Sequence, residues 1–458
     1  MAPRYVRPVR ETLRADRAEP DKTSGRLRRH GALVALLLGT AAFRMTQNMA
    51  LTTLSLLAHH SVHLGAGAIG SLGAISGIVV AFVTLVLSRR IPHHRAALSA
   101  AGGMGLLTLA LIVLAVASSF GVLLVGVMLL AVAGGLTMTG LLNAIVTEAG
   151  RRRERVIAIY TVTLSLSLAV GPLLETFVLS LAREAVRAPY VAFAVFPLLG
   201  AVLALLASRQ QRGAREAAER ARQEGGEEIE EEVPGERLVI EVSSDEVVAL
   251  GSHKESSGPL PGAPPTRRWS GGLLSTRAGQ MALVTELLYG VPFAGITVFG
   301  ALVAHVGFGF SPARVQLGFT VFFVLSLLAR AVVAFKAPII HKKALLTLAA
   351  LLTTAGLALL GLGQGAVELF LAMGLLGIPH GLTFPLSLAL IAESTPAAGL
   401  PRANATLLGS GNLLSVIVPL VLGGIIPEIG YQKMTLVMLG PVVALTGVHL
   451  ALRKAPVS

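Results

Sequence analysis

The sequence predicts an all-α polytopic membrane protein, with twelve transmembrane helices in two pseudo-symmetric six-helix bundles. Three observations predict this fold class. The composition is strongly apolar, the apolar residues fall into twelve long runs, and the first six runs resemble the last six.

The composition excludes an ordinary soluble protein. Of the 458 residues, 53% are hydrophobic and 14% are charged, and the mean hydropathy is +0.74. A soluble domain is about 25% charged, and a disordered chain needs low hydrophobicity. Cysteine is absent, which excludes disulfides, thiol catalysis and thiolate metal sites.

Each apolar run is long enough for a helix that crosses a hydrocarbon layer of about 30 Å. The runs cover residues 31–58, 66–88, 96–116, 120–146, 156–181, 190–208, 278–304, 312–335, 344–363, 366–391, 403–426 and 433–452. None shows the alternation of a membrane barrel strand, so we expect twelve helices.

The runs divide the chain into two units. We expect one six-helix bundle at 31–208 and a second at 278–453, with a basic tail at 1–30 and a short tail at 454–458. The segment 209–277 between them is rich in glutamate and proline, a composition typical of a solvated linker without fixed structure.

The basic residues predict the orientation. With the N-terminus in the cytoplasm, the segments on that side carry 32 Lys and Arg and the opposite loops carry 4. This positive-inside bias predicts a multi-pass protein of the cytoplasmic (plasma) membrane with both termini cytoplasmic. Because the bias accounts for the net charge of +13, no nucleic-acid partner is predicted.

The two halves share spaced landmarks that indicate duplication. Arg155 precedes Pro172 by 17 residues, as Arg402 precedes Pro419. Further matches pair Gly135-Leu136-Thr137…Glu148 with Gly381-Leu382-Thr383…Glu393, and His60…Gly73 with His305…Gly318. Six helices is an even number, so the copies are parallel repeats, which enclose a site between the halves near the membrane midplane.

With this layout the chain resembles the major facilitator superfamily. The resemblance rests on the six-plus-six helices, the long central loop, the basic loop at Ser88–Arg95 and Gly171-Pro172 in the fifth run. It implies a secondary active transporter that moves a small solute by alternating access. The basic loop lacks the Asp and Gly of the family's usual pattern, and the fifth run lacks two glycines typical of drug antiporters.

Arg44 is the clearest candidate for a functional residue. It lies 13 residues into the first run, or about 20 Å along a helix, where a charge must face protein or water. The residues Thr40, Arg44, Gln47, Asn48, Thr52 and Ser55 lie on one helix face. We interpret this stripe as a cavity lining in which Arg44 anchors an anionic or hydrogen-bonding group. A purely structural arginine is the alternative.

Further candidates lie in the second half. Glu286 and Tyr289 share the seventh run, and Arg330 in the eighth reaches a depth that permits an ion pair with Glu286. That pair is either structural or a protonatable coupling device. His380 and Asn412 lie at the depth of Arg44, where packing and solute contact are both consistent with the sequence.

The remaining charged residues have simpler interpretations. Glu148, Arg155, Glu393 and Arg402 lie at the cytoplasmic ends of helices, and we expect gate or interface salt bridges there. We expect Glu175, near the outer end of the fifth run, to be hydrated. The outer histidines His59, His60, His63 and His305 have no carboxylate partner, so neither a metal site nor a cofactor is predicted.

The leading hypothesis is a monomeric, proton-coupled transporter of a small solute in the lipid bilayer. A non-transporting receptor or scaffold with the same fold is an alternative, because it would need no coupled charges. A membrane-embedded enzyme is the other alternative. It would need a cluster of paired carboxylates that the sequence does not contain, so no enzymatic activity is expected.

Overall fold

The computed structural model describes residues 22–87, 91–149, 153–225, 273–336, 341–396 and 399–454, and within these ranges it is all-helical. The predicted linker is described only at its two ends, 209–225 and 273–277. The first of these continues a transmembrane helix.

Each half of the chain supplies six long helices. The first half forms α1 (Lys22–Val62), α2 (Ala66–Phe82, extended by η1, Val83–Leu87), α3 (Ala96–Ala115), α4 (Phe120–Ala149), α5 (Arg153–Leu181), the short α6 (Ala188–Phe193) and α7 (Val195–Gly225). The second half forms α8 (Arg277–Leu302, extended by η6, Val303–Gly307), α9 (Pro312–Lys336), α10 (Lys342–Leu362), α11 (Ala366–Ser394), α12 (Leu400–Ile429) and α13 (Met434–Lys454).

Eleven helical segments in the described ranges are long and apolar enough to cross a membrane, α6 and the first part of α7 counting as one. Helix α1, with 41 residues, is the twelfth long helix. It carries the polar stripe around Arg44, and those side chains lower its hydropathy. The all-α polytopic fold predicted from the sequence is therefore confirmed.

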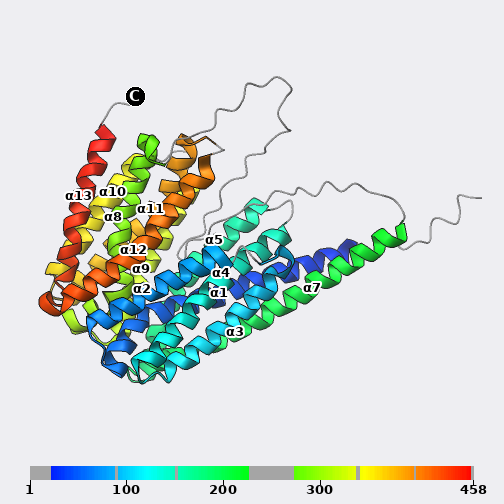
Figure 1. Ribbon diagram of the computed structural model, residues 1–458, viewed down its shortest axis with the longest axis horizontal. Coiled ribbons are helices and arrows are strands. Elements are labelled where there is room, and N and C mark those ends of the chain that lie inside the picture. The colour runs from blue at the N-terminus through cyan, green and yellow to red at the C-terminus, as the bar shows by residue number, and fades with distance from the viewer. Residues whose placement is uncertain are drawn as a thin grey trace, which may run out of the picture.

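The helices form two bundles that meet along a shared interface (Figure 1). Within the first bundle α3 packs on α4 and α1 on α7, and within the second α10 packs on α11 and α8 on α13. Between the bundles α2 packs on α12 and α5 on α9. Second and fifth helices of opposite halves therefore face each other twice, as two-fold pseudo-symmetry requires.

The bundles touch at one end and diverge at the other (Figure 1). We call the end where α7 and α13 finish the linker end, and the opposite end the far end. At the far end the Glu184 carboxylate accepts the backbone N–H of Ala313 from the other half at 2.8 Å. Several described hydrogen bonds connect helices of the two halves. Among them, the bond from Arg330 to Ser165 lies nearest to the linker end.

Two histidines at equivalent repeat positions meet at the far end. The Nε2 atoms of His60 and His305 lie 2.7 Å apart. His305 Nδ1 lies 2.5 Å from the carbonyl oxygen of Phe310, which can only accept, so Nδ1 carries the proton. With a neutral His305 ring, Nε2 is the acceptor and His60 Nε2 the donor of a hydrogen bond between equivalent positions of the two halves.

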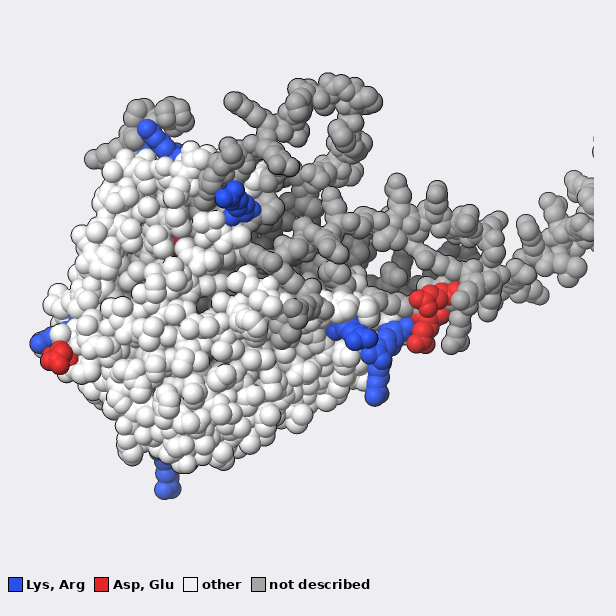
Figure 2. Space-filling view, viewed as in Figure 1, with Lys and Arg blue, Asp and Glu red and all other residues white. Residues whose placement is uncertain are grey.

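The surface of the bundles matches a membrane protein. On the face seen in Figure 2, coloured Lys, Arg, Asp and Glu side chains gather at the extremities, and the surface between them is almost free of charge. Large side chains such as Phe177, 62% exposed, and Leu205, 41% exposed, lie on that outer surface. Lipid covers such residues without cost, because acyl chains are as apolar as they are.

Close packing of α2 on α12 depends on small residues. A Cβ atom at Gly70 would lie 2.3 Å from the carbonyl oxygen of Pro419, and one at Gly423 would lie 2.8 Å from the carbonyl oxygen of Ala66. These obstacles are backbone atoms, so neither helix can accommodate a side chain without moving.

We therefore predict that Gly70→Val forces α2 and α12 apart at the far end and destabilises the closed far end by about 1–3 kcal/mol. A lower melting temperature of the detergent-solubilised protein would show it. Gly105→Ala is the matched control, since a Cβ there meets nothing within 4 Å. Equal melting temperatures for Gly70→Val and the control would contradict the prediction.

Candidate functional site

The polar face of α1 is enclosed by protein. Arg44 is 3% exposed, Thr52 is 3% exposed, and Gln47 and Asn48 are each 7% exposed. The helical repeat places them on one side of α1, where they face α4, α5 and the second bundle rather than the outer surface. The structure thus puts the guanidinium of Arg44 inside the protein, at the junction of the two halves.

Neighbouring residues orient Arg44. Its Nη1 donates to Gln47 Oε1 at 2.9 Å, one helical turn along α1. A Cβ at Gly134 of α4 would lie 2.5 Å from Gln47 Nε2, so only glycine leaves room for the amide. Asn48 donates to the carbonyl oxygen of Leu168 on α5 at 2.9 Å, which fixes α1 against α5.

The second half supplies an aromatic wall opposite this polar face. The ring of His380 on α11 lies 4.7 Å from that of Phe293, 5.2 Å from Phe322, 5.7 Å from Tyr289 and 5.9 Å from Phe323 (centroid distances). His380 is 4% exposed. We call these five rings the aromatic cluster; they are drawn from α8, α9 and α11.

Two neighbouring cavities lie between the polar face and the aromatic cluster. The smaller, about 30 Å³, is lined by residues that include Arg44, Asn48, Thr52, Phe293 and His380. Its volume holds about two waters. Polar groups from one half and rings from the other therefore enclose the same space.

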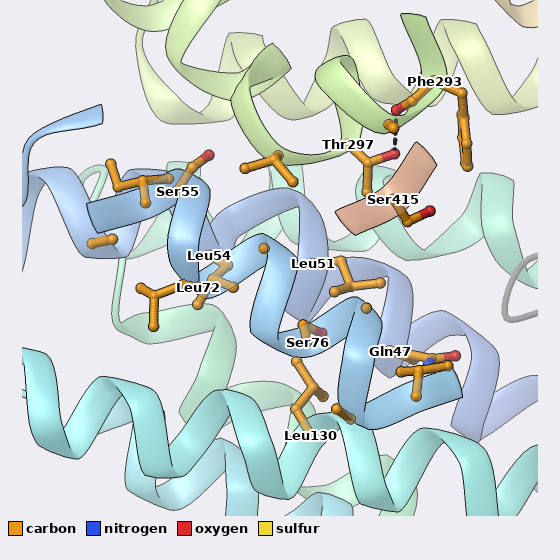
Figure 3. Close-up of a pocket in the computed structure, with 18 of the residues that line it drawn as sticks. Gln47, Leu51, Leu54, Ser55, Leu72, Ser76, Leu130, Phe293, Thr297 and Ser415 are labelled. Atoms are coloured by element: carbon orange, nitrogen blue, oxygen red, sulfur yellow. Dashed lines mark hydrogen bonds between the residues drawn. The ribbon is translucent and has the colours of Figure 1, made fainter. Parts of the chain in front are cut away.

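The larger cavity, about 110 Å³, is lined by α1, α2, α4, α8 and α12. Figure 3 shows Gln47 and Leu51 on one side of it and Phe293, Thr297 and Ser415 on the other. Asn412, a sequence candidate, also lines it. Both cavities share Leu51, Phe293 and Thr297, so they adjoin along α1.

Arg330 links the halves near the aromatic cluster. Its Nη1 donates to Ser165 Oγ on α5 at 3.1 Å, and its Nη2 donates to the carbonyl oxygen of His380 at 3.4 Å. Glu286 lies on α8, close to α12, because a Cβ at Gly411 would lie 3.8 Å from Glu286 Oε1. Arg330 thus contacts the opposite bundle, which the sequence did not indicate.

The predicted gate residues lie toward the linker end. Glu393 makes an ion pair with Lys342 of α10, within the second bundle, and its side chain is 58% exposed. Arg155 and Arg402 are exposed, and Glu148 is half-buried. An exposed pair such as Glu393–Lys342 contributes about 0–1 kcal/mol, so it is not a rigid lock.

The expectation that Glu175 is hydrated was wrong. Its side chain is 0% exposed, and it bonds to the hydroxyls of Thr52 and Thr53 on α1. The reason is close helix packing, since a Cβ at Gly171 would lie 2.9 Å from the carbonyl oxygen of Met45. One turn beyond Gly171, Glu175 is therefore pressed against α1.

Sequence reasoning missed Glu175 and Gln316 of α9, which is also 0% exposed. The available signal for Glu175 was a carboxylate inside an apolar run with no basic residue in the following turns. For the aromatic cluster there was no signal, because Phe293, Phe322 and Phe323 look like any other apolar residue of a transmembrane run.

Comparison with known proteins decides the family. The sequence profile of the Major Facilitator Superfamily matches residues 4–153, 36–363 and 283–458, which together cover almost the whole chain. The chain belongs to the Major Facilitator Superfamily. It is a multi-pass membrane transporter. A search of curated proteins finds no match to the sequence.

Solved structures of facilitator-superfamily transporters resemble this chain. The nucleoside transporter NupG has a TM-score of 0.65 at 14% identity, covering 93% of this chain and 100% of its own. The peptide transporter POT in complex with alafosfalin has a TM-score of 0.64 at 15% identity, covering 92% and 94%. At such identities the likeness concerns the fold alone.

We predict that Gly134→Ala displaces the Gln47 amide and removes its hydrogen bond to Arg44, which weakens solute binding by about tenfold. The protein should remain folded, because the obstacle is the flexible end of a side chain. Solute affinity and melting temperature measured on one preparation check this. Unchanged affinity would show that Gln47 does not orient Arg44.

Proposed function

We propose that this facilitator is a proton-coupled secondary active transporter that moves a small amphipathic solute across the cytoplasmic membrane by alternating access. One observation carries the proposal. A buried guanidinium, Arg44, belongs to one half of the protein, and the cavity that it lines is closed by an aromatic wall from the other half. A solute held there would contact both halves.

Contact with both halves is the requirement for alternating access. A ligand shifts a conformational equilibrium only if it binds the two states differently. A solute between Arg44 and the aromatic cluster would lose one set of contacts whenever the bundles separate. The cavity therefore lies where solute binding can be coupled to bundle movement.

The charge distribution supports an orientation. Lys and Arg residues predominate at the linker end, so we propose that this end and both termini face the cytoplasm. In that orientation the conformation described here is closed at the outside, where His60 contacts His305. The diverging bundles then open toward the cytoplasm.

The lining of the cavity supports one class of solute. Arginine donates two parallel hydrogen bonds and stays charged, which suits a carboxylate, a phosphate or a carbonyl-rich group. The aromatic cluster suits a planar or apolar moiety. The names of the structural neighbours, a nucleoside transporter and a peptide transporter, describe molecules that combine these features, so both classes belong in a first screen.

We predict that Arg44→Ala abolishes both solute binding and transport while the protein still inserts into the membrane. A thermal-shift screen of the solubilised protein against aromatic carboxylates, nucleosides and peptides would identify a stabilising solute. Flux of that solute into proteoliposomes would then be measured for both proteins.

Arg209→Ala serves as the control for this variant, because it removes the same charge from an exposed position on α7. Arg44→Lys should keep part of the solute binding, since lysine keeps the positive charge but cannot donate the two parallel hydrogen bonds of a guanidinium. Unchanged flux in Arg44→Ala would exclude the anchor. A solute that binds without any flux would favour a receptor over a transporter.

We predict that Glu286→Gln uncouples transport from the proton gradient. Glu286 belongs to the half that carries Arg330, and Arg330 bonds to Ser165 of the other half, so bundle movement would change the charges around the carboxylate. Exchange of solute down its own gradient should persist, whereas accumulation driven by an imposed pH gradient should be lost. Retained accumulation would exclude Glu286 as a coupling group.

A further inference from the structure

Glu175 has an unusual environment for an acidic residue. It lies on α5, is 0% exposed, and is held between two consecutive hydroxyls of α1. Thr53 Oγ1 donates to one carboxyl oxygen. The second oxygen lies 3.4 Å from Thr52 Oγ1, which lies 3.0 Å from the carbonyl oxygen of Asn48.

No cationic side chain of the described residues lies within ion-pairing distance of the Glu175 carboxyl. The nearest arginine on α1 is Arg44, two helical turns from Thr52. On α6 the closest titratable group is Tyr190, whose hydroxyl donates to the carbonyl oxygen of Ala50 at 3.2 Å. On α9 the basic residue at this end, Arg314, is exposed.

These surroundings suit a neutral carboxyl better than an ionised one. A buried, unpaired carboxylate is strongly disfavoured. A protonated carboxyl satisfies every bond here, because its O–H donates to Thr52 and its carbonyl oxygen accepts from Thr53. The Thr52 hydroxyl in turn donates a hydrogen bond to the carbonyl oxygen of Asn48.

The same network crosses to the second half. Gln316 of α9 donates through Nε2 to Thr53 Oγ1 at 3.4 Å. Gln316 is itself 0% exposed. The chain from Glu175 through Thr53 to Gln316 therefore joins α5, α1 and α9 at the far end, close to the contact of His60 with His305.

We propose that Glu175 is a proton-binding group of the transport cycle, and that its proton keeps the far end of the transporter closed. This inference deepens the proposed transport function by naming the group that links protons to one gate. When α5 and α9 separate, water reaches the carboxyl, and the proton leaves its oxygen for that water. The open state then holds an ionised, hydrated Glu175.

Thr52 also connects the Glu175 carboxyl to the cavity that contains Arg44. Its side chain also lines the cavity that contains Arg44, so one hydroxyl separates Glu175 from the proposed solute site. A proton on Glu175 and a solute beside Arg44 are therefore close enough to influence each other. By linkage, a group whose proton affinity differs between two states makes their equilibrium pH-dependent.

Paired spin labels at the far end test the proposal without a solute. The chain has no cysteine, so Ser118→Cys and Gln364→Cys, at exposed positions in far-end loops of opposite halves, label cleanly. We expect the distance between the labels, measured by double electron–electron resonance, to lengthen as pH rises. In Glu175→Gln, which mimics the protonated form, the closed distance should persist at every pH.

Three further measurements sharpen the test. Glu428→Gln, an exposed carboxylate at the same end, should keep the pH dependence. Thr53→Val should shift opening to lower pH, because it weakens the closed state. The infrared absorption of protonated carboxylic acids at neutral pH should lose one component in Glu175→Gln, whatever Glu286 contributes to the remainder. This loss reports on protonation even if the gate is otherwise impaired.

The proposal is overturned if the wild-type distance does not depend on pH, if Glu175→Gln keeps the dependence, or if that variant leaves the carboxylic-acid band undiminished. Opening at acid pH would also overturn it and would instead indicate repulsion between protonated His60 and His305. None of these readouts involves a solute, so failure here is distinguishable from failure of the Arg44 anchor, which appears as lost solute binding.

Discussion

The structure depends on one constraint, that a charged or strongly polar side chain at membrane depth must be enclosed by protein or water. Helix α1 carries Arg44, Gln47 and Asn48 in the middle of a transmembrane run, and all three are buried. The second bundle completes the enclosure with its aromatic cluster. The requirement to shield one guanidinium therefore places the cavity at the boundary between the two halves.

The two halves carry different residues at equivalent repeat positions, and this difference produces a two-sided site. The interval of 245 residues that relates His60 to His305 also relates Arg44 to Tyr289. At equivalent positions, one half thus supplies a cation and the other supplies a ring. A symmetric pair of arginines would repel each other near the axis, whereas a guanidinium facing rings leaves room for a solute.

Close helix packing determines which polar residues become functional candidates. Gly134 leaves space for the amide that orients Arg44, and Gly171 brings α5 so near α1 that Glu175 is sealed from solvent. The cavity beside Arg44 and the carboxyl at the far end are consequently neighbours, joined by Thr52. This proximity offers a physical basis for coupling between solute and proton.

The sequence by itself determined the membrane fold, since runs of apolar residues and the need to satisfy every backbone group in lipid leave few alternatives. It also singled out Arg44, because a charge inside such a run is visible without coordinates. Only the tertiary structure decided that Glu175 is buried, that Arg330 reaches Ser165, and that Phe293 and Phe322 surround His380. Those features depend on the distance and rotation between helices, which side-chain packing fixes and which hydropathy along one chain does not encode.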